Sequence, residues 1–259
     1  MAQTRLLILA AVTFSAIVVI FALPRFPQDQ AYHQFADQRQ FLGISNCLDV
    51  VSNVPFLLVG GFALAFLLRR THPGEKPPFI EPAERWPYAV FFLGVVFTSI
   101  GSAYYHLAPG DDRLIWDRVP MTIAFMAFLA AVVAERISIT AGLRLLVPLV
   151  LLGIGAVAYW HVTELQGRGD LRPYAFVQAY PMLSVPLVMI LFPPRYSRTG
   201  DLFTAVGIYV LAKVFELFDR QIFNYDRIVS GHTLKHLAAA FSAYWVLRML
   251  RLRVPLPAQ

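Results

Sequence analysis

The sequence predicts an all-α protein, a polytopic bundle of transmembrane helices. Hydrophobic residues make up 58% of the 259 residues and charged residues only 15%, whereas soluble domains carry about 25% charged residues. The mean hydropathy is +0.58. The apolar residues also gather in runs of about 18 to 24 residues, long enough to cross a hydrocarbon core of roughly 30 Å.

The first apolar run, near 6–23, follows Arg5 and precedes Pro24. A signal peptide is the alternative, but the run is long for one and no small-residue cleavage site closes it convincingly, which favours an uncleaved anchor helix. Seven further runs complete eight predicted spans. They lie near 49–69, 86–107, 114–135, 141–161, 173–193, 201–218 and 231–250.

Three segments follow from these runs: an anchor helix over 1–30, a seven-span domain over 31–252 and a short tail over 253–259. Polar residues inside several runs indicate helices that pack in a bundle instead of facing lipid all round. Small residues predict close contact between those helices. They are Gly60, Gly61, Gly101 with Ser102, Gly153 and Gly155.

The net charge of +6 does not indicate a nucleic-acid partner, because the basic residues fall in short connections between apolar runs. In a membrane protein such residues set orientation. Eight spans place 12 Lys and Arg residues on the side of the two termini and 7 on the opposite side, which predicts cytoplasmic termini. The single cysteine, Cys47, excludes an internal disulfide and a multi-thiolate metal site.

Three histidines from distant runs are expected at one depth in the membrane. His106 ends the third run, and His232 and His236 begin the eighth, on the same non-cytoplasmic side. Residues four apart share a helix face, so His232 and His236 can point at one ion. Three imidazoles with an open fourth position are typical of catalytic zinc. A hydrogen-bonded bridge between helices and a proton relay are the alternatives.

The other three histidines are weaker candidates. His161 also lies near the non-cytoplasmic side and is a rival ligand. His33 and His72 lie in the long connections 24–48 and 70–85, where a solvated side chain is expected.

Two further polar residues lie at the level of His106. Ser102 precedes it by four residues, and Asp117 follows it by 11 at the start of the next run. Asp117 could orient a histidine, bind the metal or accept a proton from metal-bound water, and Ser102 could stabilise an oxyanion. The alternatives are an Asp117–Arg118 contact with neighbouring loops and a serine bonded to its own helix.

Aromatic residues flank the same level of the membrane. They are either interface anchors or the lining of a channel for an acyl chain. These residues are Tyr104, Tyr105, Trp116 and Phe215.

The pattern Ser102-x3-His106-x10-Asp117 followed by His232-x3-His236 resembles the alkaline ceramidase family, within a superfamily of seven-span zinc hydrolases that includes the adiponectin and progestin receptors. The resemblance covers about 35–250, the last seven spans, with further matches at Ser52, Asn53 and Asp219. It implies zinc on the three histidines, water activated near Asp117, and Ser102 stabilising the tetrahedral intermediate. The implied reaction hydrolyses the amide of ceramide or a similar lipid to a long-chain base and a fatty acid.

The chain departs from the family where its members carry an acidic calcium site. The corresponding segment, FADQRQFLGISN, holds one acid, Asp37, with Asn46 near a ligand position. Calcium needs six to eight oxygen ligands, so Asp37 and Asn46 are expected to brace the following helix instead. Asp49 replaces an expected asparagine, and Thr-Leu-Lys between the last two histidines lacks an expected tryptophan. These features predict a divergent bacterial branch.

The resemblance and the topology together predict an integral protein of the bacterial inner membrane, with its site near the periplasmic face and a lipid amide as substrate. Two other classes fit the same residues. One is a receptor-like member of the superfamily with structural zinc. The other is a small proton-linked transporter that uses Asp117, Lys213, Glu216 and the histidines, although Lys213 and Glu216 could simply pair. No protein partner is predicted.

Overall fold

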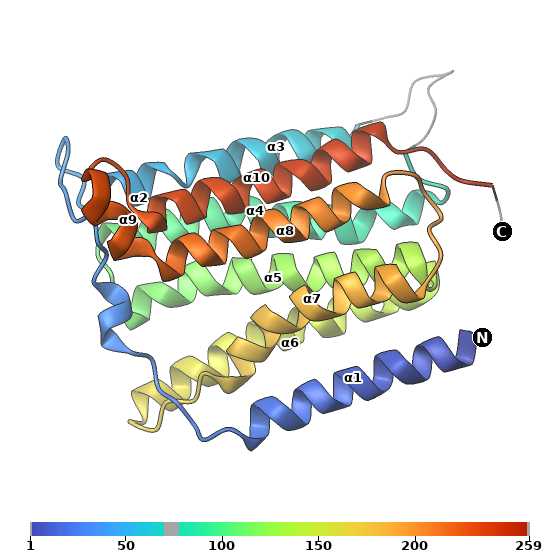
Figure 1. The fold of residues 1–259 in the computed structure, drawn as a ribbon, viewed down its shortest axis with the longest axis horizontal. Helices are drawn as coiled ribbons and strands as arrows, with labels where there is room; N and C mark the ends of the chain where they lie inside the picture. The colour runs from blue at the N-terminus through green and yellow to red at the C-terminus, as the bar shows by residue number, and fades with distance from the viewer. Residues whose placement is uncertain (1, 70–77, 258–259) are drawn as a thin grey trace.

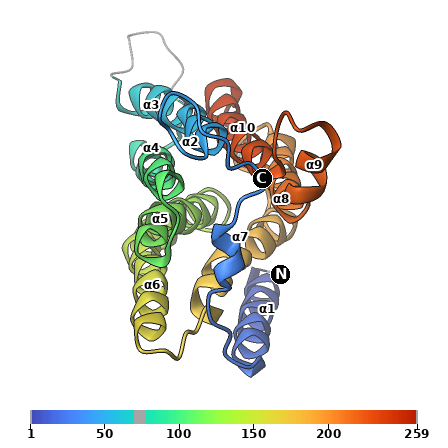
Figure 2. The ribbon, with the colours of Figure 1, turned by 90° about the vertical axis from the view of Figure 1, so that its left-hand side faces the viewer.

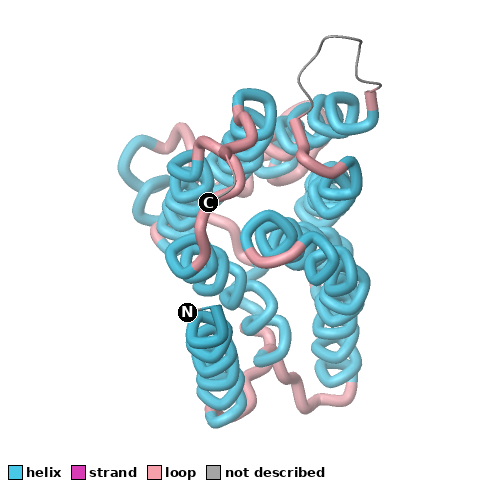
Figure 3. The backbone as a smooth tube through the Cα atoms, turned by 90° about the vertical axis from the view of Figure 1, so that its right-hand side faces the viewer, coloured by secondary structure: helices cyan, strands magenta, loops and turns pink. Residues whose placement is uncertain are grey.

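The computed structural model describes residues 2–69 and 78–257, and within them the regular elements are helices (Figures 1 and 3). The predicted positions of His72, Arg70 and Lys76 fall outside the described residues. Two isolated bridges join Phe41 to Ile44 and Tyr196 to Pro255. The helices are α1 (Ala2–Ala22), η1 (Gln30–His33), α2 (Cys47–Val51), α3 (Val54–Leu68), η2 (Pro82–Glu84), α4 (Arg85–Leu107), α5 (Asp111–Arg136), α6 (Ile139–Leu165), α7 (Arg172–Leu191), α8 (Thr199–Leu217), α9 (Asp219–Asp226) and α10 (Gly231–Leu252).

The all-α prediction is confirmed, and the number of spans is supported in part. Among the described residues, six helices are long and apolar enough to cross a membrane, so the molecule is a polytopic membrane protein. The last two predicted spans form α8 and α10 at the expected positions. These two helices do not meet the same test, because they carry charged side chains such as Lys213, Glu216 and Lys235.

The helices enclose a central space. Figure 2 shows α3, α4 and α5 on one side and α10 and α8 on the other, with α7 between α5 and α8. Helix α6 packs outside α5 and α7, and α1 packs on α7 at the edge of the bundle. The hydroxyls of Thr13 and Tyr180 are 2.6 Å apart and join α1 to α7. Both termini lie at one end of the bundle, opposite α2 and α9 (Figure 1).

The close approach of α4 and α5 depends on glycine. A Cβ atom at Gly101 would lie 1.8 Å from the carbonyl oxygen of Trp116, so no side chain fits there without separating the two backbones. Ser102 and Asp117 are the next residues on the two helices, and this contact therefore brings them together. Gly60 and Gly153 make similar close contacts with α4 and α5. Gly61 and Gly155 do not, since a Cβ atom there meets nothing within 4 Å.

The points where helices end or begin also position side chains of the site. The chain leaves the helical ladder at Ser52 and Asn53, between α2 and α3, which aims the Ser52 hydroxyl into the bundle. Gly231, the first residue of α10, lies against the turn between α8 and α9, because a Cβ atom there would be 2.2 Å from the carbonyl oxygen of Phe215. His232 follows directly, so this contact positions its ring.

Gly101→Ala should separate α4 from α5 and destabilise the protein by about 1 to 3 kcal/mol, the usual effect of overpacking. Gly61→Ala is the matched control, since its added methyl group meets open space. Thermal unfolding of the two purified variants in detergent measures the difference. Equal melting temperatures would show that the α4–α5 approach can relax.

Candidate metal centre

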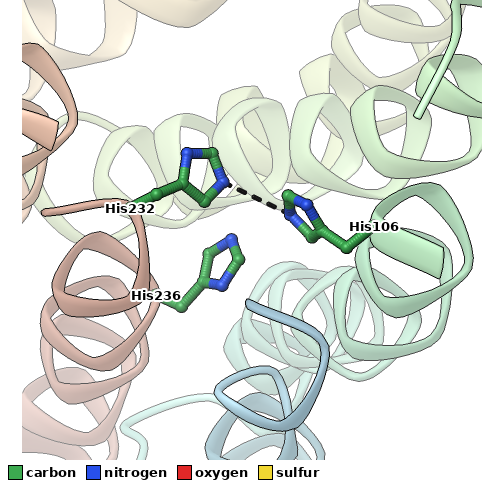
Figure 4. A group of neighbouring side chains, drawn as sticks. All are labelled: His106, His232 and His236. Atoms are coloured by element: carbon green, nitrogen blue, oxygen red, sulfur yellow. Dashed lines mark hydrogen bonds between the residues drawn. The ribbon is translucent and has the colours of Figure 1, made fainter. Parts of the chain in front are cut away.

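Three buried histidines meet at the end of the bundle that holds α2 and α9. His106 lies in the last turn of α4, and His232 and His236 lie on one face of the first turns of α10 (Figure 4). The exposed fractions of the three residues are only 1%, 4% and 3%. Their ring nitrogens lie within 4.8 Å of one another. The predicted convergence of the three histidines is confirmed, and they form a group that could hold a metal ion.

The distance between two of the three rings fits a divalent metal. The Nε2 atoms of His106 and His232 are 3.3 Å apart, and two nitrogens held 2.0–2.1 Å from zinc in tetrahedral geometry are about 3.3 Å apart. The Nδ1 atom of His106 is buried and has no hydrogen-bond partner among the described residues. Zinc suits such an all-imidazole set, although the donors alone do not select it over other divalent metals.

A hydrogen bond sets the tautomer of His236. The Ser52 hydroxyl donates its proton to the carbonyl oxygen of Asp49 at 3.1 Å and lies 2.8 Å from Nδ1 of His236. Because that proton is already used, the hydroxyl accepts a hydrogen bond from Nδ1–H. This leaves the lone pair on Nε2 of His236 for a metal, an arrangement typical of ligating histidines.

Other side chains hold the backbone of the site. Asn46 donates to the carbonyl oxygen of His106 at 2.8 Å, and Asp219 accepts from the backbone N–H of His232 at 2.8 Å. Asp49 accepts from the Thr233 hydroxyl at 2.6 Å. These three residues therefore fix the two segments that carry the histidines. Asn46 was predicted to brace the helix that follows it, but its side chain makes no cap there and holds the end of α4 instead.

Asp37 braces its own loop instead of pointing to a cation site. Both of its carboxylate oxygens accept from the Arg39 guanidinium, at 2.8 and 2.7 Å. Burial raises the pKa of Asp37, but the hydrogen bonds and charge of Arg39 outweigh burial and hold it below the ordinary value. The carboxylate is therefore ionised and fully engaged by arginine.

Two of the remaining histidines differ from expectation. His33 was predicted to be solvated, but its Nδ1 lies 2.8 Å from the Tyr105 hydroxyl and its Nε2 lies 3.0 Å from Asp111. This pairing of the loop with α4 and α5 explains why the ring is largely buried. His161, the predicted rival ligand, lies on α6 beside Trp160 and is not part of the three-histidine group.

Of the two roles predicted for the flanking aromatic residues, the exposure of Trp116 and Tyr104 fits the interface anchors and not the channel lining. Trp116 is 62% exposed and Tyr104 is 44% exposed, so neither lines the interior. Instead, the ring of Phe35 lies 4.6 Å from the rings of both His106 and His232. No periodic pattern points to Phe35, because it lies in an irregular loop.

A partly open cavity of about 190 Å³ is lined at one end by His236 and extends between the helices of the bundle. Ser102 and Asp117 both line its polar end. The deeper walls are mostly apolar. They include Phe91, Val95, Phe128, Ala205, Ala243 and Val246.

Three charged residues at the polar end were not predicted to act together. Lys235 lies 2.9 Å from Nε2 of His232 and donates to Glu216 at 3.2 Å, and Glu216 also pairs with Lys213. The Lys213–Glu216 pairing predicted from their spacing is confirmed. Because the Lys235 ammonium contacts a ligand nitrogen, a metal ion would displace it towards Glu216. In the sequence, only the position of Lys235 between His232 and His236 could have indicated that it belongs to the site.

No family model matches the chain, and no curated protein matches it either.

His232→Ala and His236→Ala should each lose the bound metal, because two imidazoles hold a divalent ion far more weakly than three. His161→Ala is the matched control and should keep it. Metal content per chain, measured by atomic emission on protein purified without chelators, checks the prediction. Metal that stays in either α10 variant would contradict the site.

Ser52→Ala should weaken metal binding about 10- to 100-fold, the usual effect of removing a hydrogen bond that orients a ligating histidine. Competition with a chromogenic chelator measures the affinity. Affinity equal to that of the native protein would mean that Ser52 does not set the orientation of His236.

Proposed function

We propose that this protein is a zinc-dependent integral membrane amidase that hydrolyses ceramide or a similar lipid amide to a long-chain base and a fatty acid. The observation that carries the proposal is the buried three-histidine group, of which His236 lines the polar end of a mostly apolar cavity. A zinc site alone has many uses, whereas a zinc site that opens into a narrow apolar cavity suits a single acyl chain.

The length of the cavity supports an acyl ligand. Its lining extends over 12 residues of α10, from Lys235 to Val246, and over 12 residues of α4, from Ser102 back to Phe91, which is 11 steps along each helix. At 1.5 Å per residue these stretches are about 16 Å long. That length matches about half of a 30 Å hydrocarbon core, the depth that one leaflet of acyl chains fills.

The residues at the mouth have distinct roles in this proposal. When bound, zinc supplies Lewis-acid polarisation of a carbonyl and an acidified water. Asp117 accepts the proton of the attacking water at its carboxylate and delivers it to the leaving amine nitrogen. Ser102 donates a hydrogen bond to the carbonyl oxygen as negative charge develops there. One water is consumed for each amide broken.

The same proposal places the protein in the alkaline ceramidase family, in the bacterial inner membrane. Helices α8 and α10 would be the seventh and eighth spans, which puts both termini in the cytoplasm and the metal centre near the periplasmic face. Calcium has no part in it, since Asp37 is engaged by Arg39.

Transport is the less favoured alternative. The proton path it requires would use Lys213 and Glu216, and these residues instead satisfy one another together with Lys235. A receptor with structural zinc differs from an enzyme only in turnover, so the assay below separates the two.

Asp117→Asn should keep the metal and lower the turnover of a ceramide substrate by about 10²- to 10⁴-fold, the usual contribution of a general base. Metal content and release of the long-chain base are measured on one preparation. Asn cannot accept the proton but preserves the shape of the side chain. Full activity of this variant would contradict the role of Asp117, and no turnover by the native, metal-loaded protein would contradict the amidase.

Ala243→Phe should shorten the cavity and shift the preferred acyl chain to fewer carbons, because Ala243 lines its deep end. Leu237→Phe, on the exposed face of α10, is the control. Relative rates for a series of acyl lengths test the prediction. An unchanged chain-length profile would mean that the acyl chain lies elsewhere.

A further inference from the structure

Arg118 is a buried cation with no carboxylate partner. It follows Asp117 on α5, its exposed fraction is 4%, and it lines the polar end of the cavity. Among the described residues it forms no ion pair, and its one hydrogen bond goes to the side-chain carbonyl of Gln28 at 2.5 Å. Its Nε and Nη1 atoms are buried without an acceptor. Each buried donor without an acceptor is costly, and a buried charge without a counterion is more so.

Aromatic rings hold this guanidinium in place without neutralising it. Its central carbon lies 4.3 Å from the Trp160 ring centre and 4.4 Å from that of Tyr174, with Tyr32 at 5.7 Å. Cation–π contacts stabilise the charge but supply no hydrogen-bond acceptor for the edges of the guanidinium. The side chain is therefore positioned in advance for an anionic ligand.

The carboxylates at this end of the cavity do not act as counterions of Arg118. Glu216 is shared by Lys213 and Lys235, and among the described residues no ion pair joins Asp117 to Arg118. Cations outnumber carboxylates among the charged residues that line the cavity. A neutral lipid amide would leave this imbalance in place, whereas an acidic one would remove it.

We infer that Arg118 binds the acidic headgroup of an acyl lipid whose tail fills the cavity. The inference rests on the proposed function for the identification of that lipid as a substrate, and it narrows the substrate class to N-acyl amino acids and related acidic amides. Consecutive residues on α5 have Cα atoms about 3.8 Å apart. Arg118 and Asp117 line the same cavity, so a carboxylate bound by Arg118 holds its amide in the cavity where the proposed hydrolysis occurs.

The test compares ligands that share a 12-carbon chain, with the protein in nanodiscs of neutral phosphatidylcholine. Dodecanoate and dodecanol contain no amide, so their binding is independent of hydrolysis. The native protein should bind dodecanoate about 10- to 100-fold more tightly than dodecanol, as expected for hydrogen bonds between charged groups. Equal affinities would overturn the inference without any variant.

Variants of Arg118 test whether this residue binds the anion. Arg118→Gln should abolish the preference for dodecanoate, and Arg118→Lys should keep part of it, since lysine retains the charge but not the bidentate geometry. Arg113→Gln is the matched control, because Arg113 lies on the same helix outside the cavity lining and packs on Tyr104. A preference that survives in Arg118→Gln would overturn the inference.

His106→Ala separates the inference from the proposed function. If the metal held the anion, this variant would lose the preference, and that outcome would overturn the role of Arg118. If the preference persists in it, Arg118 binds the anion whether or not the protein is an amidase. In the same variant, tighter binding of N-dodecanoylglycine than of dodecanoate supports a substrate headgroup. Tighter binding of dodecanoate would indicate that the site binds the fatty-acid product. It would overturn the inference that Arg118 binds the headgroup of a substrate.

Discussion

Polar groups inside an apolar helix bundle must satisfy one another, and the structure of this protein follows from that constraint. The three buried histidines and the buried carboxylates of Asp49 and Asp117 lie at one end, together with Lys213 and Lys235, where α4, α5, α8 and α10 meet the loop that contains η1. Each group that lacks a partner in this region costs free energy of the order of 1 to 3 kcal/mol. The glycine contacts, the break between α2 and α3, and the irregular loop all serve to bring partners within reach.

The site combines rigid and adaptable parts. His236 is held by Ser52, and the backbone of His232 is held by Asp219, so both depend on segments outside α10. Lys235 is different, because it can contact either His232 or Glu216. A change of metal occupancy would therefore shift one flexible ammonium while the histidine scaffold stays fixed. The cavity beyond these groups is lined mostly by apolar residues, which separates the binding of a tail from the chemistry of a headgroup.

The opposite end of the bundle is stabilised by a second buried polar cluster. Arg253, just after α10, forms an ion pair with Glu135 at 2.6 Å, and Tyr88 donates to the same carboxylate at 2.8 Å. This cluster joins the ends of α4, α5 and α10 and contains no group of ligating histidines. The Arg253–Glu135 pair fixes one end of α10, and the contacts of Gly231 and Asp219 fix the other end. The register of His232 and His236 is therefore determined from both ends of the helix.

The sequence by itself determined the helical membrane class, the positions of the apolar runs and the meeting of His106 with His232 and His236. Each of these follows from local periodicity or from the alternation of spans, so no tertiary contact was needed to predict them. Only the tertiary structure decided that Ser52 sets the His236 tautomer, that Phe35 covers the site, and that Arg118 lies in the cavity without a counterion. Those facts depend on contacts between residues far apart in the sequence, such as Ser52 and His236, which are 184 positions apart. Side-chain packing creates such contacts, and local sequence patterns do not encode them. The same reason explains why His33 was misjudged, since a loop residue becomes buried only when the loop folds back onto α4 and α5.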